Sequence, residues 1–169
     1  MAVESLPSIP MPMLRPLPLR TRGRVWLRRA IAWLWSARVW ELAAEYQYTR
    51  PSGEVLVIPA GFHTDFASSP RAFWPLGMDP TGILLVPSLI HDWGYRHDWY
   101  FDGSGRRVHE GEGKRFHDRL LREISAEVNG MVVPGFVAWM ALEVFGWPAW
   151  LSACQHRTGG IDLDGVYRD

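Results

Sequence analysis

The chain has almost no cysteine. Cys154 is its only one in 169 residues, so the chain cannot form an internal disulfide or a zinc site made of several cysteines. This composition fits a reducing compartment such as the cytosol. The CxxC, Walker A and GxGxxG patterns are also absent, so the sequence does not support phosphate-cradling chemistry.

The chain also lacks net charge. It has 18 Lys plus Arg against 18 Asp plus Glu, so no nucleic-acid partner is expected from its overall charge. The charge is nevertheless uneven, because residues 15–38 contain seven arginines and no acid. With 47% hydrophobic and 21% charged residues, the rest of the chain has a globular composition.

Composition divides the chain into three parts. Residues 1–39 form a Pro-rich basic arm followed by a Trp-rich amphipathic helix, residues 40–150 a single globular domain, and residues 151–169 a C-terminal tail. The arm, over residues 1–38, and surface tryptophans among the ten in the chain are expected to contact partner proteins. A Trp-rich basic helix could instead lie on a membrane, but packing on protein is favoured.

One apolar stretch raises the question of a membrane span. Residues 131–151 approach the necessary length, but Pro134, Glu143 and Pro148 interrupt them. The stretch is therefore interpreted as a buried core helix, with membrane contact as the less favoured alternative.

Periodicity predicts a fold of the α+β class. A hairpin over residues 40–59 forms a small antiparallel sheet, and a long loop follows it. About three packed helices come next, over residues 83–100, 111–128 and 132–146. In the first helix, regular structure is expected from about Val86, with Pro87 in the first turn.

Side chains that can take part in acid–base catalysis gather on the first two predicted helices. His91 and Asp92 are adjacent, and Tyr95 lies within one turn of both. Asp118 borders the apolar stripe of the second helix, from which a carboxylate can orient a histidine on a neighbouring helix. The catalytic candidates are therefore His91, Asp118 and Tyr95. In the alternative interpretation, Asp118 is a solvated acid paired with Lys114 or Arg122.

The loop GFHTDFASSPR adds a second group of polar residues. Asp65 and Asp92 are the candidate metal ligands, and carboxylates suit calcium or magnesium better than zinc. Arg71 and Ser68 are candidate anion-binding or structural partners. The alternative is a structural turn in which Asp65 and Ser68 cap backbone amides.

Two motifs in order, IPAGFHTDFASSPRAFW and LIHDWGY, are followed by FHDRLLREI and a helix ending in FG. Over residues 40–146 this pattern resembles the phage domain-of-unknown-function family numbered 1353. The resemblance implies a phage or prophage origin and no assigned activity. The residues that it implicates are Gly61, Asp65, Ser68, Pro70, Arg71, His91, Asp92, Tyr95 and Asp118.

The HDxxY helix is also similar to that of secretory and viral phospholipases of the A-two class. In those enzymes the histidine activates a water, the following aspartate holds calcium, and an aspartate on a second helix orients the histidine. The likeness would give these roles to His91, Asp92 and Asp118. The flanking cysteines and the calcium-loop glycines of those enzymes are missing here.

Three functions remain open from the sequence. The first is a phage-encoded minor virion or tail-associated protein, located in the virion and, during assembly, in the host cytoplasm. Residues 1–38 and surface tryptophans would then contact other virion or tail proteins. Its His/Asp site would lock the core or bind a metal. The second is a hydrolase, dependent on a metal or a His/Asp dyad and directed at lipid or another envelope component. The third is a small host-modulating protein.

Overall fold

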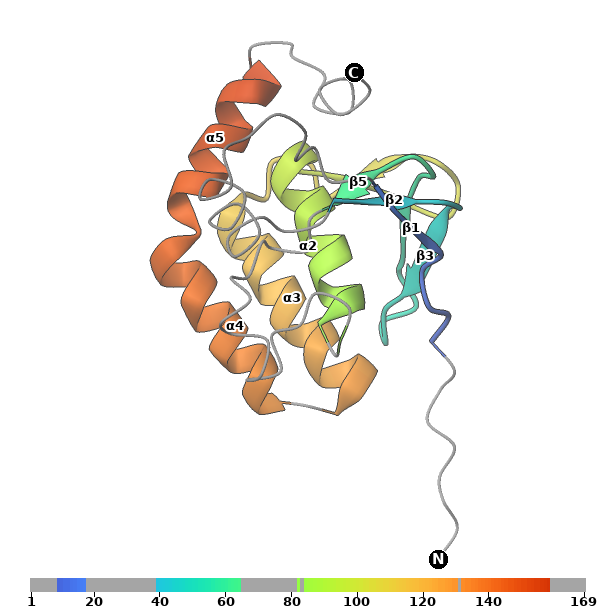
Figure 1. Cartoon of the computed structure of the whole chain (residues 1–169), viewed down its shortest axis with the longest axis horizontal. Coiled ribbons are helices and arrows are strands. Elements are labelled where there is room, and N and C mark those ends of the chain that lie inside the picture. Colours follow the sequence, from blue (N-terminus) through green and yellow to red (C-terminus); the bar gives the residue numbers. More distant parts are fainter. Residues whose placement is uncertain (1–8, 18–38, 65–81, 83, 131, 159–169) are drawn as a thin grey trace, which may run out of the picture.

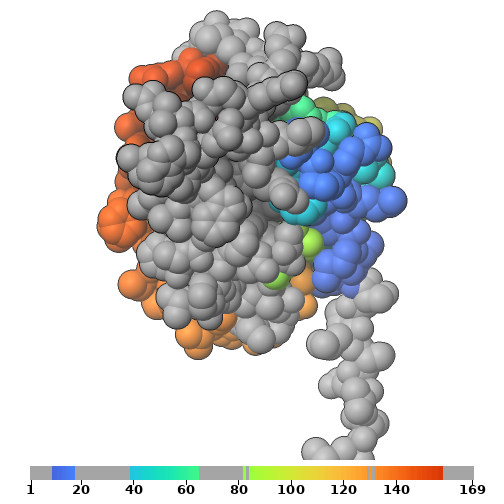
Figure 2. Space-filling model, in the orientation of Figure 1, coloured from blue at the N-terminus to red at the C-terminus, as the bar shows by residue number. Residues whose placement is uncertain are grey.

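The computed structural model describes residues 9–17, 39–64, 82, 84–130 and 132–158. Strands lie on one side and helices on the other, with α2 and α3 between the strands and the outer helices α4 and α5 (Figure 1). In the space-filling view, the first strands and the outer helices occupy opposite edges of the molecule (Figure 2). This confirms the α+β class. The predicted Trp-rich helix and most of the loop after Thr64 lie outside the described residues.

Two small antiparallel sheets make up the strand side. One has the order β1-β2-β5 and the other β3-β4-β6-β7. The strands are β1 (Leu14–Pro16), β2 (Trp40–Leu42), β3 (Tyr46–Thr49), β4 (Val55–Ile58), β5 (His63–Thr64), β6 (Tyr100–Phe101) and β7 (Arg107–Val108). Strand β1 belongs to the Pro-rich arm and pairs with β2, so this part of the arm is held by its own chain.

The predicted hairpin is present, but its first strand is divided. β3 pairs with β4 across the turn at Arg50–Glu54, where Gly53 takes a positive φ of 84° and its amide donates to the Arg50 carbonyl at 2.9 Å. β2 pairs with β1 and β5 in the other sheet, and residues 43–45 lie between it and β3. An alternating sequence pattern does not reveal where a strand changes sheets.

In the described residues after the hairpin, four helices are present, one more than the three predicted there. They are α2 (Leu85–His97), α3 (Lys114–Asn129), α4 (Val132–Phe145) and α5 (Trp147–Thr158). Pro87 lies in the first turn of α2, as expected, where the missing N–H leaves no intrahelical bond unmade. α5 extends into the segment assigned to the C-terminal tail and packs against α2 and α4.

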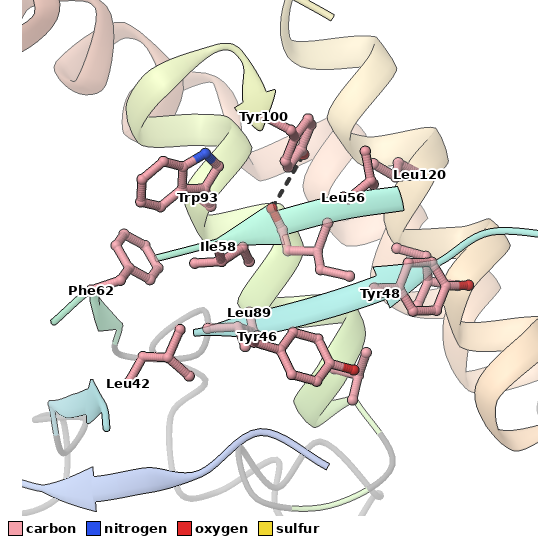
Figure 3. Close-up of a cluster of buried hydrophobic side chains, with 13 residues drawn as sticks. Leu42, Tyr46, Tyr48, Leu56, Ile58, Phe62, Leu89, Trp93, Tyr100 and Leu120 are labelled. Carbon is pink, nitrogen blue, oxygen red and sulfur yellow. Dashed lines mark hydrogen bonds between the residues drawn. The ribbon is translucent and has the colours of Figure 1, made fainter. Parts of the chain in front are cut away.

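The hydrophobic core lies between the strands and the two inner helices (Figure 3). The strands and the following turn contribute Leu42, Tyr46, Tyr48, Leu56, Ile58 and Phe62, and the helical side contributes Val86, Leu89, Ile90, Trp93, Leu120 and Ile124. The Tyr48 ring points toward α3, where its hydroxyl donates to the Glu127 carboxylate. Tyr100 is fully buried, and its hydroxyl oxygen lies 3.2 Å from the Ile90 carbonyl oxygen. This core holds α2 and α3 in fixed positions.

Gly94 allows two polar side chains to approach α2. A Cβ added there would lie 2.3 Å from the His117 Nδ1 atom and 2.3 Å from the Tyr100 hydroxyl oxygen. Both neighbours are fully buried and hydrogen-bonded to each other, so neither can move aside freely. The glycine of the HDWGY motif is therefore required by packing.

We predict that Gly94→Ala lowers the free energy of unfolding by about 3 kcal/mol, near the upper end of measured overpacking costs. Gly103→Ala is the matched control, because its nearest neighbours lie 3.8 and 3.9 Å from the added carbon. The control should change stability by less than about 0.5 kcal/mol. Urea denaturation measures both changes, and equal stability of the two variants would contradict this account of Gly94.

Candidate functional site

Two adjacent helices bring the predicted catalytic residues together. His91 and Tyr95 lie one turn apart on α2, with ring centroids separated by 4.0 Å. Lys114 and Asp118 lie one turn apart on α3, which packs against α2. Since residues four apart share a face of a helix, all four side chains meet between the two helices. The predicted grouping of His91, Tyr95 and Asp118 is present in the structure.

Asp118 is the centre of this group. Its Oδ1 atom accepts from the Tyr95 hydroxyl at 2.7 Å and lies 2.9 Å from His91 Nε2. Its Oδ2 atom accepts from the Lys114 ammonium. Burial alone would raise the pKa of Asp118, but hydrogen bonds from His91, Lys114 and Tyr95 outweigh it and lower that pKa below its ordinary value. Asp118 is therefore an ionised carboxylate in a buried site.

The predicted alternative of a solvated acid is wrong, although the pairing with Lys114 is present. Asp118 is 0% exposed and Lys114 only 2% exposed. The Lys114 ammonium also donates to the Leu142 carbonyl at 2.8 Å, which ties the site to α4. Arg122 is not a partner of Asp118; its guanidinium lies 5.0 Å from the centre of the Trp139 ring. Lys114, expected from the sequence only as a partner at the surface, is a buried member of the site.

The two ring nitrogens of His91 have different surroundings. An ionised carboxylate only accepts hydrogen bonds, so Nε2 carries the proton that faces Asp118. The neutral ring then has its free lone pair on Nδ1. That atom is buried, has no hydrogen-bond partner among the described residues, and lies 3.9 Å from Asp92 Oδ1. The second nitrogen is thus left free to take a proton.

The charge state of His91 is set by opposing influences. Burial lowers the pKa of His91, but the hydrogen bond to Asp118 and the nearby Asp92 carboxylate outweigh burial and raise it above 6.5. Tyr95 remains a neutral donor, because burial and the Asp118 carboxylate raise its pKa far above the ordinary value. The site therefore favours an imidazolium over an ordinary buried imidazole.

Asp92 lies at the edge of the site. The Thr64 hydroxyl donates to its Oδ2 atom, which links β5 to α2. The Asp92 side chain is 11% exposed, so solvent reaches a group beside His91 Nδ1. Asp65, Ser68 and Arg71 lie outside the described residues. In the described part of the chain, no group of three or more His, Cys, Asp or Glu side chains is arranged to hold a metal ion. A calcium or magnesium site through Asp65 and Asp92 stays a prediction.

A second histidine–aspartate pair lies beside the first. His117 Nε2 is 2.9 Å from Asp98 Oδ1, and its Nδ1 is 2.9 Å from the Tyr100 hydroxyl. Asp98 Oδ1 also accepts from the Gly113 amide at 3.0 Å, at the start of α3. Every polar atom of the His117 ring is paired, so this pair joins the end of α2 to α3. Two features of the sequence could have indicated this second pair. One is the second His-Asp dipeptide at 97–98, and the other is Gly94, whose missing side chain leaves space for His117.

Helix α5 packs against Tyr95 through Arg157 and Trp150. The Arg157 guanidinium donates to the Tyr95 carbonyl at 2.8 Å and lies 4.4 Å from the Trp150 ring centre. The Trp150 ring in turn meets the Tyr95 ring edge-on, with centroids 5.2 Å apart. α5 therefore supports the residue that holds Asp118.

We predict that Lys114→Met destabilises the fold by about 3–5 kcal/mol, because it leaves the Asp118 carboxylate buried without its cation. Arg115→Met is the matched control, since Arg115 is the next residue on α3 and is exposed. Its effect should be below about 0.5 kcal/mol. Thermal and urea unfolding report both values, and a Lys114→Met variant as stable as the control would show that the buried ion pair is not required.

The two buried histidines are predicted to respond oppositely to pH. Burial lowers the pKa of His117 to about 4 despite its bond to Asp98, so His117 removes stability as pH falls from 6.5 towards 4, by up to about 3 kcal/mol. The pKa of His91 is raised, so its contribution to stability is present at low pH and is lost as pH rises through that pKa.

Imidazole nitrogen NMR at pH 5.5 should show a neutral His117 and a protonated His91. His117→Gln and His91→Gln assign the signals. In urea titrations, His117→Gln should also weaken the loss of stability between pH 6.5 and 4. Protonation of His117 near pH 6.5 would be incompatible with the buried environment described here.

Comparison with known proteins identifies a family but no activity. No curated protein and no solved structure matches the chain. The model of one family, described as a protein of unknown function (DUF1353), matches residues 40–142. That range contains the described strands from β2 onward, α2, α3 and most of α4, and thus all of His91, Asp92, Tyr95, Lys114 and Asp118. The chain belongs to the DUF1353 family of proteins of unknown function.

Proposed function

We propose that the protein is a hydrolase in which His91 is the general base and Asp118 orients it. The observation that carries the proposal is the buried Nδ1 atom of His91, which has no hydrogen-bond partner within the described parts of the chain. A ring fixed by a carboxylate on one nitrogen, with the lone pair of the other free, is the arrangement that proton abstraction requires.

In the proposed reaction, Nδ1 takes a proton from a water molecule as its oxygen attacks an ester carbonyl or phosphoryl centre. The same proton then passes from His91 to the leaving group, so the base is regenerated. Asp118 holds the ring in the required tautomer and stabilises the imidazolium that forms. Tyr95 and Lys114 occupy the remaining acceptor positions of Asp118 and keep its carboxylate in place.

The charge balance supports this cycle. With His91 neutral, the Asp118 carboxylate and the Lys114 ammonium compensate each other. Proton uptake adds one positive charge at His91, and the Asp92 carboxylate lies 3.9 Å from the nitrogen that receives it. The protonated form of His91 therefore arises beside a compensating charge, which lowers its cost in a buried site.

A purely structural role for the site explains fewer of the contacts. The same hydrogen bonds do lock α2 to α3 and α4, as the sequence analysis anticipated for a core-locking network. A structural network normally pairs each buried polar atom, because an unpaired one costs about 1–3 kcal/mol. The His117 pair meets that condition, whereas His91 Nδ1 does not. The contrast between the two neighbouring histidines favours chemistry at His91.

The biological setting stays a prediction from the sequence. A minor virion or tail component should be found by mass spectrometry of purified particles. If the protein is absent from particles, the virion assignment fails while the proposal for His91 is unaffected.

The test of the proposed function compares wild type, His91→Gln and Asp118→Asn on p-nitrophenyl esters of increasing chain length and on phospholipid vesicles. We expect both variants to lose at least 100-fold in kcat/KM, since general-base catalysis contributes roughly 10²–10⁴-fold. His156→Gln, near the end of α5, is the matched control and should keep wild-type activity. Circular dichroism checks that each variant is folded.

The pH profile separates a catalytic from a structural His91. Wild-type activity should rise with pH through a limb above 6.5, because the base must be neutral and its pKa is raised. Residual activity of Asp118→Asn should show that limb at lower pH, because the carboxylate that raises the pKa is gone. Hydrolysis that persists in His91→Gln, or a wild type inactive on every substrate class, would remove the hydrolase assignment.

A further inference from the structure

Helix α4 has an exposed side without a single polar residue. Its eight exposed residues are Val132, Val133, Phe136, Val137, Met140, Ala141, Val144 and Phe145. Val133 is 73% exposed and Phe145 is 77% exposed. Trp147 and Leu151 of α5, also exposed, extend this surface, which we call the α4 face. Such a continuous apolar surface marks a binding site for a partner or a membrane.

The prediction of a buried core helix over residues 131–151 therefore holds for only one side of α4. One side of α4 packs closely on α3, where a Cβ added at Gly135 would lie 2.6 Å from the Ser125 Cβ atom. The side chains on the opposite side are exposed, and α4 lies at the outer edge of the molecule (Figure 1).

The geometry favours lying on a bilayer over crossing it. In the described part of the chain, no single helix is long and apolar enough to cross a membrane. α4 and α5 together pass by length and composition, but they are bent by 66° at the break between them. The 14 residues of α4 span about 21 Å, which is less than the roughly 30 Å of a hydrocarbon core.

A row of arginines borders the α4 face. Arg115, Arg119 and Arg122 are exposed on α3 at spacings of four and three residues, which places them on one side of that helix. Arg122 contacts α4 directly, with its guanidinium 5.0 Å from the Trp139 ring centre. Among the described residues, none of the three arginines forms an ion pair with a carboxylate.

The acids of α3 are engaged elsewhere. Glu123 pairs with Arg50, and Glu127 accepts from Tyr48, so both are directed towards the strands. On α4 the one acid, Glu143, is half-buried and does not belong to the exposed face. The border of the α4 face therefore has positive charge that the described surface does not neutralise.

We propose that the α4 face docks on an anionic lipid bilayer, with α4 lying in the plane of the interface. Its valine, phenylalanine and methionine side chains enter the boundary between headgroups and acyl chains, and the arginines of α3 contact lipid phosphates. A second copy of the chain fits less well, because it would bring another unneutralised arginine row to the contact and no acidic partner for the first. This docking surface is independent of the proposed hydrolase activity.

Sedimentation with vesicles tests the proposal on the full chain. We expect binding to vesicles of 70% phosphatidylcholine and 30% phosphatidylglycerol, at least tenfold weaker binding to pure phosphatidylcholine, and weakening by salt. The double variant Val137→Glu, Met140→Glu should lose at least tenfold in affinity for the anionic vesicles. Arg115→Gln with Arg119→Gln should reduce the preference for anionic vesicles while leaving α4 unchanged.

Met11→Glu with Met13→Glu is the matched control, because both methionines are exposed and apolar but lie at the opposite edge, next to β1. This control and His91→Gln should bind vesicles like wild type, which keeps docking separate from catalysis. Circular dichroism confirms that each variant is folded. The proposal would be overturned if the wild type did not bind vesicles, or if the double variant Val137→Glu, Met140→Glu bound them as well as the wild type. It would also be overturned if the wild type were a dimer that the double variant dissociates, because the α4 face would then bind a second copy of the chain.

Discussion

The buried carboxylate of Asp118 is the constraint on which the helical half of the protein depends. A negative charge without solvent access must receive hydrogen bonds on both oxygens, and here α2 supplies two donors and α3 the cation. The lysine that neutralises it is itself buried and needs a further acceptor, which α4 provides through Leu142. One charge thus determines the contacts among three helices. Hydrophobic packing alone would allow these helices to slide relative to one another, whereas the hydrogen-bond directions allow a single arrangement.

The same arrangement explains why two neighbouring histidines differ. His117 lies where α2 ends, and its two nitrogens serve Asp98 and Tyr100, so the ring is used completely as a connector. His91 lies on α2, and of its two nitrogens only Nε2 has a hydrogen-bond partner in the part of the chain that the structure describes. Because burial is similar for both, the difference comes from their partners: His91 is near two carboxylates, and His117 is near one. The number of neighbouring carboxylates, more than the extent of burial, decides which histidine favours its charged form.

The sequence was informative where local rules decide the structure. Pro87 and Gly130 mark the start of α2 and the end of α3, and the spacing of His91 and Tyr95 predicts their shared face. The sequence was less informative where long-range pairing decides. The split between β2 and β3 depends on which sheet each joins, and Lys114 resembles a surface residue until Leu142 is placed beside it. The helix α5 was missed because the last predicted helix was ended at residue 146 and residues 151–169 were assigned to a tail, although Pro148 is compatible with a first turn.

The contact between α5 and Tyr95 has a consequence for how the protein is made. Tyr95 depends on Arg157 and Trp150, which leave the ribosome well after α2 and α3. Since synthesis proceeds from the N-terminus, the strands and inner helices can assemble first, while the histidine site lacks its outer support. The site reaches its final form only when the last helix docks. A nascent chain that had not yet reached α5 would therefore have an assembled core in which Tyr95 lacks its outer support, which delays any chemistry at the site until α5 has been made.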